Sequence, residues 1–227
     1  MIKASIQIGK RKIENRVVLQ PMEGCDCNLD GSPSELTVKK YRNAAKSGAG
    51  IVWFEANTVC PEGRTNARQM MLTKENLPAF KTLLREMAKK ECGVSPIFIL
   101  QLTHSGRQSI VPMIAYRHPI YEERRPATDD HIVTDAYLDT LAHRYAESAR
   151  LAVEAGFDGV DVKSCHASAL VDRMPNTQNG ARRETRTITR GAISTLEPIS
   201  DIPDPELWFE RLLARKRKEI EHERPTV

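Results

Sequence analysis

The fold of this chain is decided by the stretch Gly156-Phe157-Asp158-Gly159-Val160-Asp161-Val162-Lys163-Ser164-Cys165-His166. Its first glycine ends a helical pattern, and a short apolar run follows that brings Lys163 and His166 close together in the sequence. In a parallel α/β barrel the reactive groups lie where strands end and loops begin, so polar residues just after a buried run mark the expected place for chemistry. The stretch therefore predicts a strand over residues 159–163, with part of a functional site directly after it.

Alternating apolar runs and helical patterns occupy the chain upstream of this stretch. Short buried strands are predicted over residues 16–20, 50–55 and 96–101. Helices are predicted between the strands, over residues 34–47, 76–91 and 134–155. Strands that are apolar on both faces must be covered on both sides, which favours parallel βαβ units. The pattern predicts an α/β fold of the TIM (β/α)8-barrel type, with four consecutive units between residues 14 and 166.

Local signals add detail to this prediction. Residues 3–13 form a predicted hairpin, because Ile6 and Ile8 alternate with polar residues before the Gly9-Lys10 turn. Helical spacing places Leu36 on the core face of the helix at 34–47 and Val153 on the core face of the helix that Thr134 caps. The polar segment 105–131 is longer than most connections in compact domains, so we expect a functional or mobile loop there.

Composition and charge exclude several classes of protein. The 227 residues carry 34 basic and 30 acidic side chains, and this balance argues against nucleic-acid binding on charge alone. The five cysteines are odd in number and irregularly spaced, and Cys25 and Cys27 form C-x-C without a second cluster, so neither a disulfide framework nor a structural zinc site is expected. No signal peptide or membrane span is predicted, and we expect a cytoplasmic location.

Polar side chains near the ends of the predicted strands suggest a cofactor site. A planar, electron-accepting cofactor needs an amide that pairs with its ring, together with cationic donors near the part of the ring that becomes negative on reduction. Gln101 can provide the amide, and Lys163 and His166 can provide the donors. All three are expected at one rim of the barrel.

Ordered segments of the chain resemble the Old Yellow Enzyme family of FMN-dependent NAD(P)H:flavin oxidoreductases. Each segment is weakly specific by itself, but the ordered set, which spans about residues 3–166, is specific. The segments are Asn15-Arg16-Val17-Val18-Leu19-Gln20-Pro21-Met22, Glu55-Ala56, Pro61-Glu62-Gly63-Arg64, Gln101-Leu102-Thr103-His104-Ser105-Gly106-Arg107 and residues 155–166.

The resemblance implies a (β/α)8 barrel that holds FMN at the rim formed by the carboxyl ends of its strands. FMN would be reduced by NADH or NADPH and reoxidised by an activated alkene, a quinone or a similar acceptor. The residues implied to line the flavin ring are Pro21, Met22 and Ala56, and Gln101 is implied to bind its pyrimidine edge. Lys163 and His166 occupy the positions of a pair that holds the acceptor's oxygen and polarises it for hydride attack.

Three features depart from the family pattern. Glu23 occupies a position where a threonine that tunes the flavin is frequent. Ala167-Ser168 replace the usual Gly-Tyr, so the tyrosine that commonly protonates the substrate carbon is missing. The segment after residue 166 lacks the family's later motifs, so residues 1–166 are interpreted as the N-terminal half of an FMN-binding barrel. Residues 167–227 are interpreted as an atypical polar tail with a C-terminal helix, in place of the second half.

Alternatives remain open at the level of both residues and function. Lys163 could form a strand-end ion pair and His166 could be a core histidine, while His104 and Arg107 could serve structure as well as catalysis. A Cys165–His166 dyad is disfavoured, because neighbours on a strand point to opposite faces. The functional alternative to an FMN oxidoreductase is a truncated or frame-altered remnant with weak or no FMN binding and no turnover. The expected partners are a small-molecule acceptor and either a second copy of the chain or a complementing chain, because an unpaired strand edge favours association.

Overall fold

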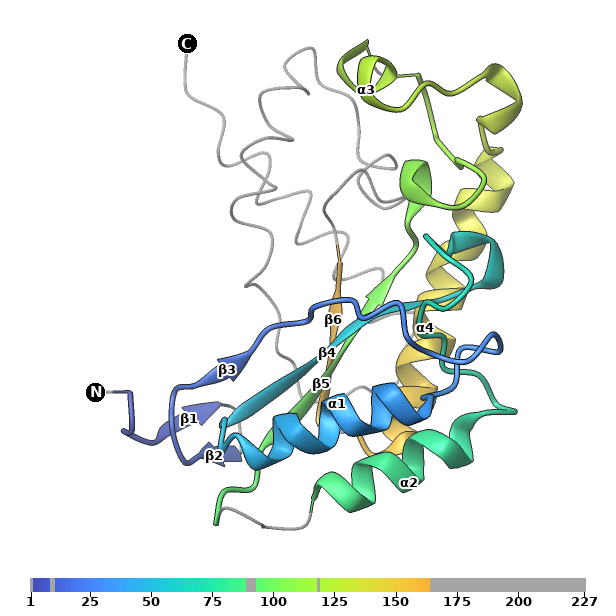
Figure 1. The fold of residues 1–227 in the computed structure, drawn as a ribbon. Coiled ribbons are helices and arrows are strands. Elements are labelled where there is room, and N and C mark those ends of the chain that lie inside the picture. Colours follow the sequence, from blue (N-terminus) through green and yellow to red (C-terminus); the bar gives the residue numbers. More distant parts are fainter. Residues whose placement is uncertain (1, 9–10, 89–92, 118, 164–227) are drawn as a thin grey trace, which may run out of the picture.

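The computed structural model describes residues 2–8, 11–88, 93–117 and 119–163 (Figure 1). Its main sheet is parallel and has the strand order β3-β4-β5-β6. The strands are β3 (Val18–Leu19), β4 (Ile51–Thr58), β5 (Ile97–Thr103) and β6 (Gly159–Val162). Each strand pairs with the next one along the chain, and a helix connects each pair, which confirms the predicted α/β arrangement.

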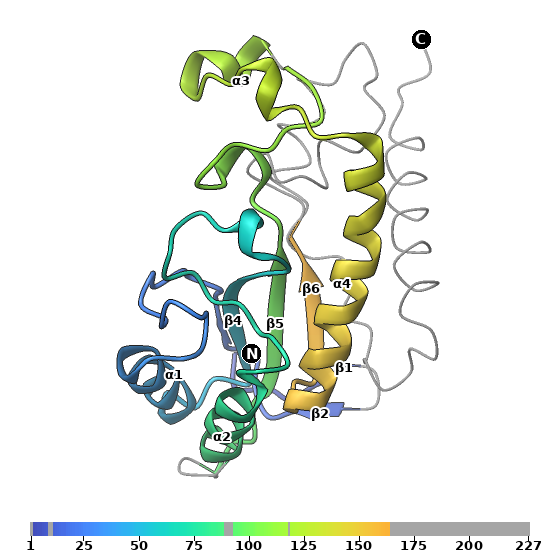
Figure 2. The same ribbon diagram turned by 90° about the vertical axis from the view of Figure 1, so that its right-hand side faces the viewer.

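Three long helices pack against one face of this sheet (Figure 2). They are α1 (Glu35–Lys46), α2 (Leu77–Met87) and α4 (Asp135–Ala155), and each connects two neighbouring strands. Phe54 of β4 is fully buried in this layer, where its ring stacks on Tyr41 at 3.8 Å between centroids and meets Phe157 edge-on at 4.9 Å. Such aromatic packing makes the helix-facing layer the larger of the two apolar clusters in the described residues.

The opposite face of the sheet carries a smaller apolar cluster of isoleucines. Ile51, Ile97 and Ile99 pack there against Ile13 of the antiparallel hairpin formed by β1 (Ile6–Ile8) and β2 (Arg11–Ile13). Arg11 of the hairpin pairs with Asp158, which precedes β6, at 2.6 Å. The predicted hairpin is therefore confirmed, and it lies against the amino-terminal ends of the strands, leaving the carboxyl ends free for a site.

The helix boundaries follow the local signals in the sequence. Ser34 accepts a hydrogen bond from the Thr37 backbone N–H at the start of α1, and Thr134 accepts one from Tyr137 at the start of α4. Gly156 ends α4 with a positive φ of 104°, a conformation that favours glycine.

Two predicted core positions are wrong. Leu36 is 65% exposed and Val153 is 43% exposed. In α1 the buried residues are Thr37, Tyr41 and Ala44. The Thr37 hydroxyl donates to Asp26 and contacts Cys27 in the preceding loop, so this side of the helix faces inward and Leu36 faces outward. The buried stripe of α4 continues through Ala152 and Ala155, which places Val153 at its edge.

The strand lengths also differ from the prediction. β3 has two residues where five were expected, because the Val17 N–H bonds the Asn15 side chain and Pro21 has no N–H to donate. β4 and β5 run on to Thr58 and Thr103, so Glu55 and Gln101 lie inside strands rather than at the predicted strand ends. The predicted loop at 105–131 contains helix α3 (Pro119–Arg124) and two helical turns at Gly106–Gln108 and Asp129–His131.

None of the helices that the structure describes has both the length and the apolar character needed to cross a membrane.

Replacing Phe54 with alanine should destabilise the chain by about 3–5 kcal/mol, because the cavity would lie between three other aromatic rings. Leu36→Ala is the matched control, since this exposed leucine should change the free energy of unfolding by less than about 0.5 kcal/mol. Chemical denaturation of both variants measures the difference. Equal losses would show that the helix-facing layer is assigned wrongly.

Candidate active site at the carboxyl edge of the sheet

The carboxyl ends of β5 and β6 bring three polar residues together. Gln101 of β5 lies opposite Asp161 of β6, and its Nε2 donates to Asp161 Oδ2 at 2.8 Å. Side chains two residues apart on a strand share a face, so Gln101 continues the face that carries Ile97 and Ile99. Lys163 follows β6 and is held in register by its backbone N–H, which donates to the Leu102 carbonyl at 2.8 Å.

Lys163 forms an ion pair with Glu23, which lies in the loop after β3. Its Nζ is 3.4 Å from Glu23 Oε1, and the two side chains are 17% and 26% exposed. The pair joins the loop after the first strand of the sheet to the end of the last described strand. The geometry thus agrees with the alternative that Lys163 forms a strand-end ion pair. Its partner, Glu23, is the residue that replaces the frequent threonine of the family.

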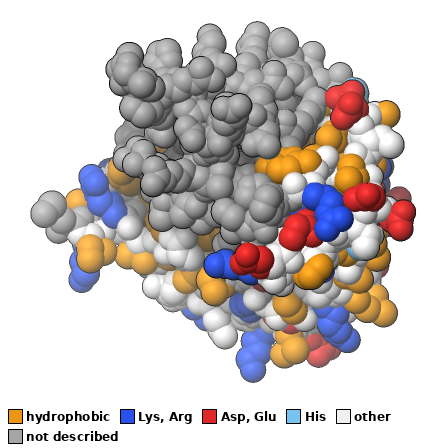
Figure 3. Space-filling model, turned by 90° about the horizontal axis from the view of Figure 1, so that it is seen from above, with side chains coloured by type: hydrophobic (Ala, Val, Ile, Leu, Met, Phe, Trp, Pro, Cys, Tyr) orange, Lys and Arg blue, Asp and Glu red, His pale blue; other side chains and the backbone are white. Residues whose placement is uncertain are grey.

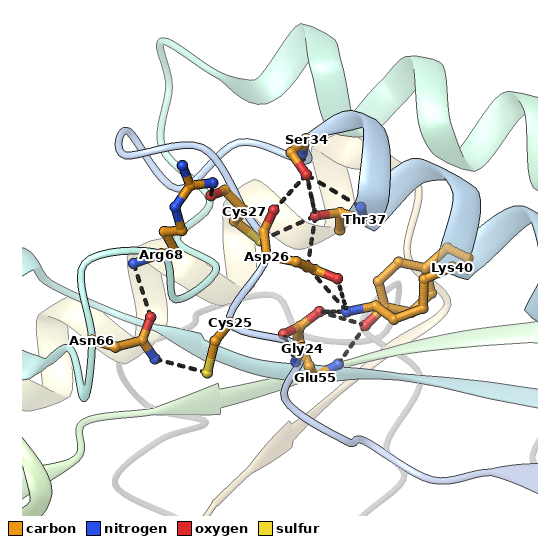
Figure 4. A network of polar contacts seen from close by, with 11 residues as sticks. Gly24, Cys25, Asp26, Cys27, Ser34, Thr37, Lys40, Glu55, Asn66 and Arg68 are labelled. Atoms are coloured by element: carbon orange, nitrogen blue, oxygen red, sulfur yellow. Dashed lines mark hydrogen bonds and ion pairs between the residues drawn. The ribbon is translucent and has the colours of Figure 1, made fainter.

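A buried carboxylate anchors the loop that carries Glu23 (Figure 4). Glu55 of β4 has a side chain only 1% exposed and accepts the Gly24 backbone N–H at 2.8 Å. Lys40 Nζ of α1 lies 2.6 Å from the same carboxylate, and the Tyr41 hydroxyl lies 3.3 Å from it. A buried charge must be paired and hydrogen-bonded, and these contacts meet that requirement for Glu55.

The same network includes a cysteine and a second carboxylate. One ligand atom each of Asp26, Cys27 and Glu55 lie within 4.8 Å of one another. Lys40 contacts both carboxylates, at 3.2 Å for Asp26, and supplies positive charge at the centre of the group. Burial raises the pKa of the Cys27 thiol to about 12, so the thiol stays protonated and is a poor metal ligand.

Cys25 is the exposed cysteine of the C-x-C segment. Its backbone has a positive φ of 50°, and its sulfur accepts a hydrogen bond from Asn66 at 3.2 Å. Burial and the nearby carboxylates of Glu23, Glu55 and Asp26 raise its pKa. A raised pKa lowers the fraction of thiolate, so the environment does not activate Cys25 as a nucleophile.

His104 lies in a polar cluster between β5 and α4. Its Nδ1 accepts the Gly106 N–H at 3.1 Å, so the proton of the neutral ring lies on Nε2, 2.9 Å from the Tyr137 hydroxyl. Tyr137 donates in turn to Glu62 at 3.0 Å, and Arg144 pairs with the same carboxylate. Burial lowers the pKa of His104 to about 4. His104 therefore connects the strand end to α4, which is a structural role.

Arg107 anchors the long segment that follows β5. The side chain is 1% exposed, and its Nη1 lies 2.9 Å from Glu122 of α3. It also donates to the carbonyl oxygens of Arg125 and Tyr116. These contacts fold the segment 105–131 onto a buried guanidinium, so Arg107 too serves the structure in this arrangement.

The remaining candidate residues are placed as follows. Met22 is 76% exposed and Pro21 is half-buried, in the loop after β3. Ala56 is fully buried within β4, and its carbonyl accepts the Gln69 amide at 3.2 Å. Gln101 and Lys163 are half-buried on neighbouring strands, whereas His166, together with Cys165 and the predicted tail at 167–227, lies outside the described residues.

Sequence reasoning missed the partners of these residues. Asp161, Lys40 and the pairing of Glu23 with Lys163 were not anticipated, although Glu23 stood out as an acidic residue at an unusual position. Where the described surface is visible from above, acidic and basic side chains lie next to one another (Figure 3).

A model of the NADH:flavin oxidoreductase / NADH oxidase family matches residues 3–183. Cinnamate reductase of Clostridium sporogenes is 30% identical over 180 residues, which cover 74% of this chain and 26% of the reductase. NADPH dehydrogenase of Listeria welshimeri is 25% identical over 202 residues, which cover 84% of this chain and 58% of the dehydrogenase. The chain therefore spans between about a quarter and somewhat over half of the length of these relatives.

Solved structures share the fold. The Old Yellow Enzyme from a Pichia species aligns with a TM-score of 0.65 at 20% identity, over 85% of this chain and 56% of that chain. Morphinone reductase in complex with tetrahydroNAD aligns with a TM-score of 0.65 at 19% identity, over 84% and 60%. At this identity the likeness establishes the barrel-type fold of the described strands and helices.

The buried neutral His104 should make stability depend on pH. Well above pH 6.5 the ring is neutral in both the folded and the unfolded chain, and it contributes no pH dependence. Between 6.5 and about 4 the unfolded chain binds a proton that the folded chain does not, so the free energy of unfolding should fall as pH falls, by up to about 1.4 kcal/mol per unit.

His104→Gln is the matched variant for this measurement, because its amide can still donate to Tyr137 but does not titrate. Urea denaturation at pH 7, 6 and 5 should show a weaker decline for the variant than for the wild-type chain. Parallel curves for the two chains would contradict the assignment of the decline to His104.

Proposed function

The chain belongs to the NADH:flavin oxidoreductase / NADH oxidase family, and on this premise we propose that it is an FMN-dependent oxidoreductase. It would pass hydride from NADH or NADPH through FMN to an activated alkene, a quinone or a similar small acceptor. The name NADPH dehydrogenase supports a nicotinamide as the hydride donor, and the name cinnamate reductase supports an activated alkene as the acceptor.

The observation that carries the proposal is the placement of Gln101 and Lys163 at one rim, with Gln101 in β5 and Lys163 directly after the neighbouring β6. An amide and an ammonium at the same rim fit a planar heteroaromatic group and an oxygen-bearing acceptor. Pro21 and Met22 add an apolar, accessible edge to the same end of the sheet. The described residues therefore fit the cofactor, with Gln101 and the loop at residues 21–22 as the groups that would hold it.

When bound, FMN supplies the ability to take up hydride from a nicotinamide and to release it to an acceptor. The chain's own residues have separate tasks. Gln101, whose orientation Asp161 fixes, would pair with the polar edge of the ring. Lys163 would donate a hydrogen bond to the acceptor's oxygen, where negative charge develops, and His166 is the expected second donor.

The alternative is a chain with the family sequence but no turnover. The replacement of Gly-Tyr by Ala167-Ser168 favours it, because a proton donor is lost there. We propose as partners a small-molecule acceptor and either a second copy of the chain or a complementing chain, and these partners are compatible with both functions. Measurements of flavin binding and of the two half-reactions distinguish an active oxidoreductase from a chain without turnover.

Binding of FMN to the purified chain should be weak, with a dissociation constant of roughly 10 μM or higher, because no phosphate-binding loop of the family type is recognised in the sequence. Equilibrium dialysis with FMN measures the constant, and riboflavin is the control that lacks the phosphate. Similar affinities for FMN and riboflavin would agree with the reasoning, whereas tight binding of FMN alone would contradict it.

In the chain saturated with FMN, His166→Ala should slow acceptor reduction by about 10²-fold or more, because a donor to the developing charge is lost. Flavin reduction by NAD(P)H should change little. Stopped-flow absorbance follows the two half-reactions separately, and His143→Ala on the exposed side of α4 is the matched control. An equal loss in both half-reactions would remove the role assigned to His166.

Alkenes that need a proton on carbon should be reduced more slowly than quinones, because Ala167-Ser168 provide no acid at the family position. Turnover with an enone and with a benzoquinone at matched concentrations measures the preference. Restoring the pair with Ala167→Gly and Ser168→Tyr should narrow the difference, and a fast enone reaction in the unaltered chain would refute this prediction.

A further inference from the structure

The ion pair between Glu23 and Lys163 has an unusual position in the fold. Glu23 lies in the loop after β3 and Lys163 lies at the end of β6, and these are the two outer strands of the described sheet. Their side chains meet at the carboxyl ends of the strands, at the same rim as Gln101. The contact therefore joins the lysine at one edge of the described sheet to the loop at the other edge.

Glu23 is held from both sides by contacts that do not involve Lys163. The following residue, Gly24, donates its N–H to buried Glu55, and the Thr65 hydroxyl lies 3.5 Å from Glu23 Oε2. A Cβ at position 24 would overlap the Lys40 amine and the Asp26 carboxylate, so the loop approaches the Glu55 network as closely as a glycine allows. Glu23 is thus presented by a backbone whose position a buried charge determines.

Lys163 has the opposite character. A lysine is a flexible four-carbon chain with three N–H donors at its end, so its ammonium has no fixed direction unless a partner gives it one. Glu23 accepts one of these donors at 3.4 Å. Three donors allow one ammonium to contact a carboxylate and the oxygen of a bound molecule together.

We propose that Glu23 is a positioning residue that holds the Lys163 ammonium at the rim, ready to donate to the oxygen of an acceptor. This inference rests on the proposed function for the identity of that acceptor. The arrangement has three layers: the Lys40–Glu55 pair fixes the loop, the loop fixes Glu23, and Glu23 fixes Lys163. Glu23 acts through Lys163 and contacts no reacting atom itself.

The first test measures the pair in the full chain without flavin. Glu23→Gln keeps the shape of the side chain but removes its charge, so the Lys163 amine should lose its ion pair with residue 23. Its acetylation rate, followed by peptide mass spectrometry, should rise by about 5-fold, as expected for the loss of a partly exposed ion pair. Glu86→Gln, which removes the partner of Arg42 in a surface ion pair between α1 and α2, is the control and should leave Lys163 labelling unchanged.

The second test is a double-mutant cycle on acceptor reduction with FMN bound. Glu23→Gln alone should slow acceptor reduction by about 10-fold or more, with flavin reduction by NAD(P)H within about 2-fold of wild type, since a misplaced donor affects only the step that uses it. In a Lys163→Met background, the same Glu23→Gln change should have less than about a 2-fold effect. The double variant Glu23→Lys, Lys163→Glu exchanges the two charges and should recover the thermal stability that either single substitution loses. It should not recover acceptor reduction, because the ammonium is then at position 23.

The outcomes separate this inference from the proposed function. Unchanged labelling of Lys163 in Glu23→Gln, or independent effects of the two substitutions in the cycle, would overturn the positioning role. A wild-type chain that binds FMN and turns over, with the cycle non-additive, supports both proposals. A wild-type chain with no flavin reduction would overturn the proposed function and the role in acceptor reduction, while the labelling result alone would still decide whether Glu23 holds Lys163.

Discussion

The charge of Glu55 is the constraint on which the rim of this structure depends. A carboxylate with a 1% exposed side chain is costly to bury without partners, and here the partners come from two other segments of the chain. Lys40 and Tyr41 bring α1, Gly24 brings the loop after β3, and Glu55 itself lies in β4 beside an irregularity of strand register between Phe54 and Asn57. Such irregularities redirect side chains near functional sites, and this one directs a carboxylate toward α1.

The two faces of the sheet have different roles: one packs against the helices, and the other carries the candidate site. The face toward α1, α2 and α4 is filled by aromatic and aliphatic side chains that pack around Phe54. The other face is apolar only near the amino-terminal ends of the strands, where the hairpin covers it, and becomes polar at Gln101 and Asp161. A single strand such as β5 therefore contributes Ile97 and Ile99 to a core and, two residues later, Gln101 to a site.

The order of the elements could be predicted from the sequence because it depends on local signals. Helix-ending glycines followed by apolar runs of strand length specify βα units, and Ser34, Thr134 and Gly156 act in the structure as caps. Contacts between distant residues leave no such signal. The pairing of Glu23 with Lys163 joins residues 140 positions apart, and the burial of Thr37 in place of Leu36 depends on a hydrogen bond to Asp26. Periodicity reports which residues are apolar, but it does not report which polar residues find partners inside.

In the proposed reaction, the groups at this end of the sheet limit where a proton for the acceptor can come from. Among the described residues at this end of the sheet, the Tyr137 hydroxyl is a chemically plausible acid, but it donates to Glu62 and lies beside His104, between the strand end and α4. Burial, followed by the charges of its neighbours, raises the pKa of Tyr137, and burial lowers that of His104, so one holds its proton firmly and the other does not acquire one near neutral pH. Neither group is therefore suited to deliver a proton to a bound acceptor. Under the proposed function, this arrangement of groups favours an acceptor that takes its proton from solvent.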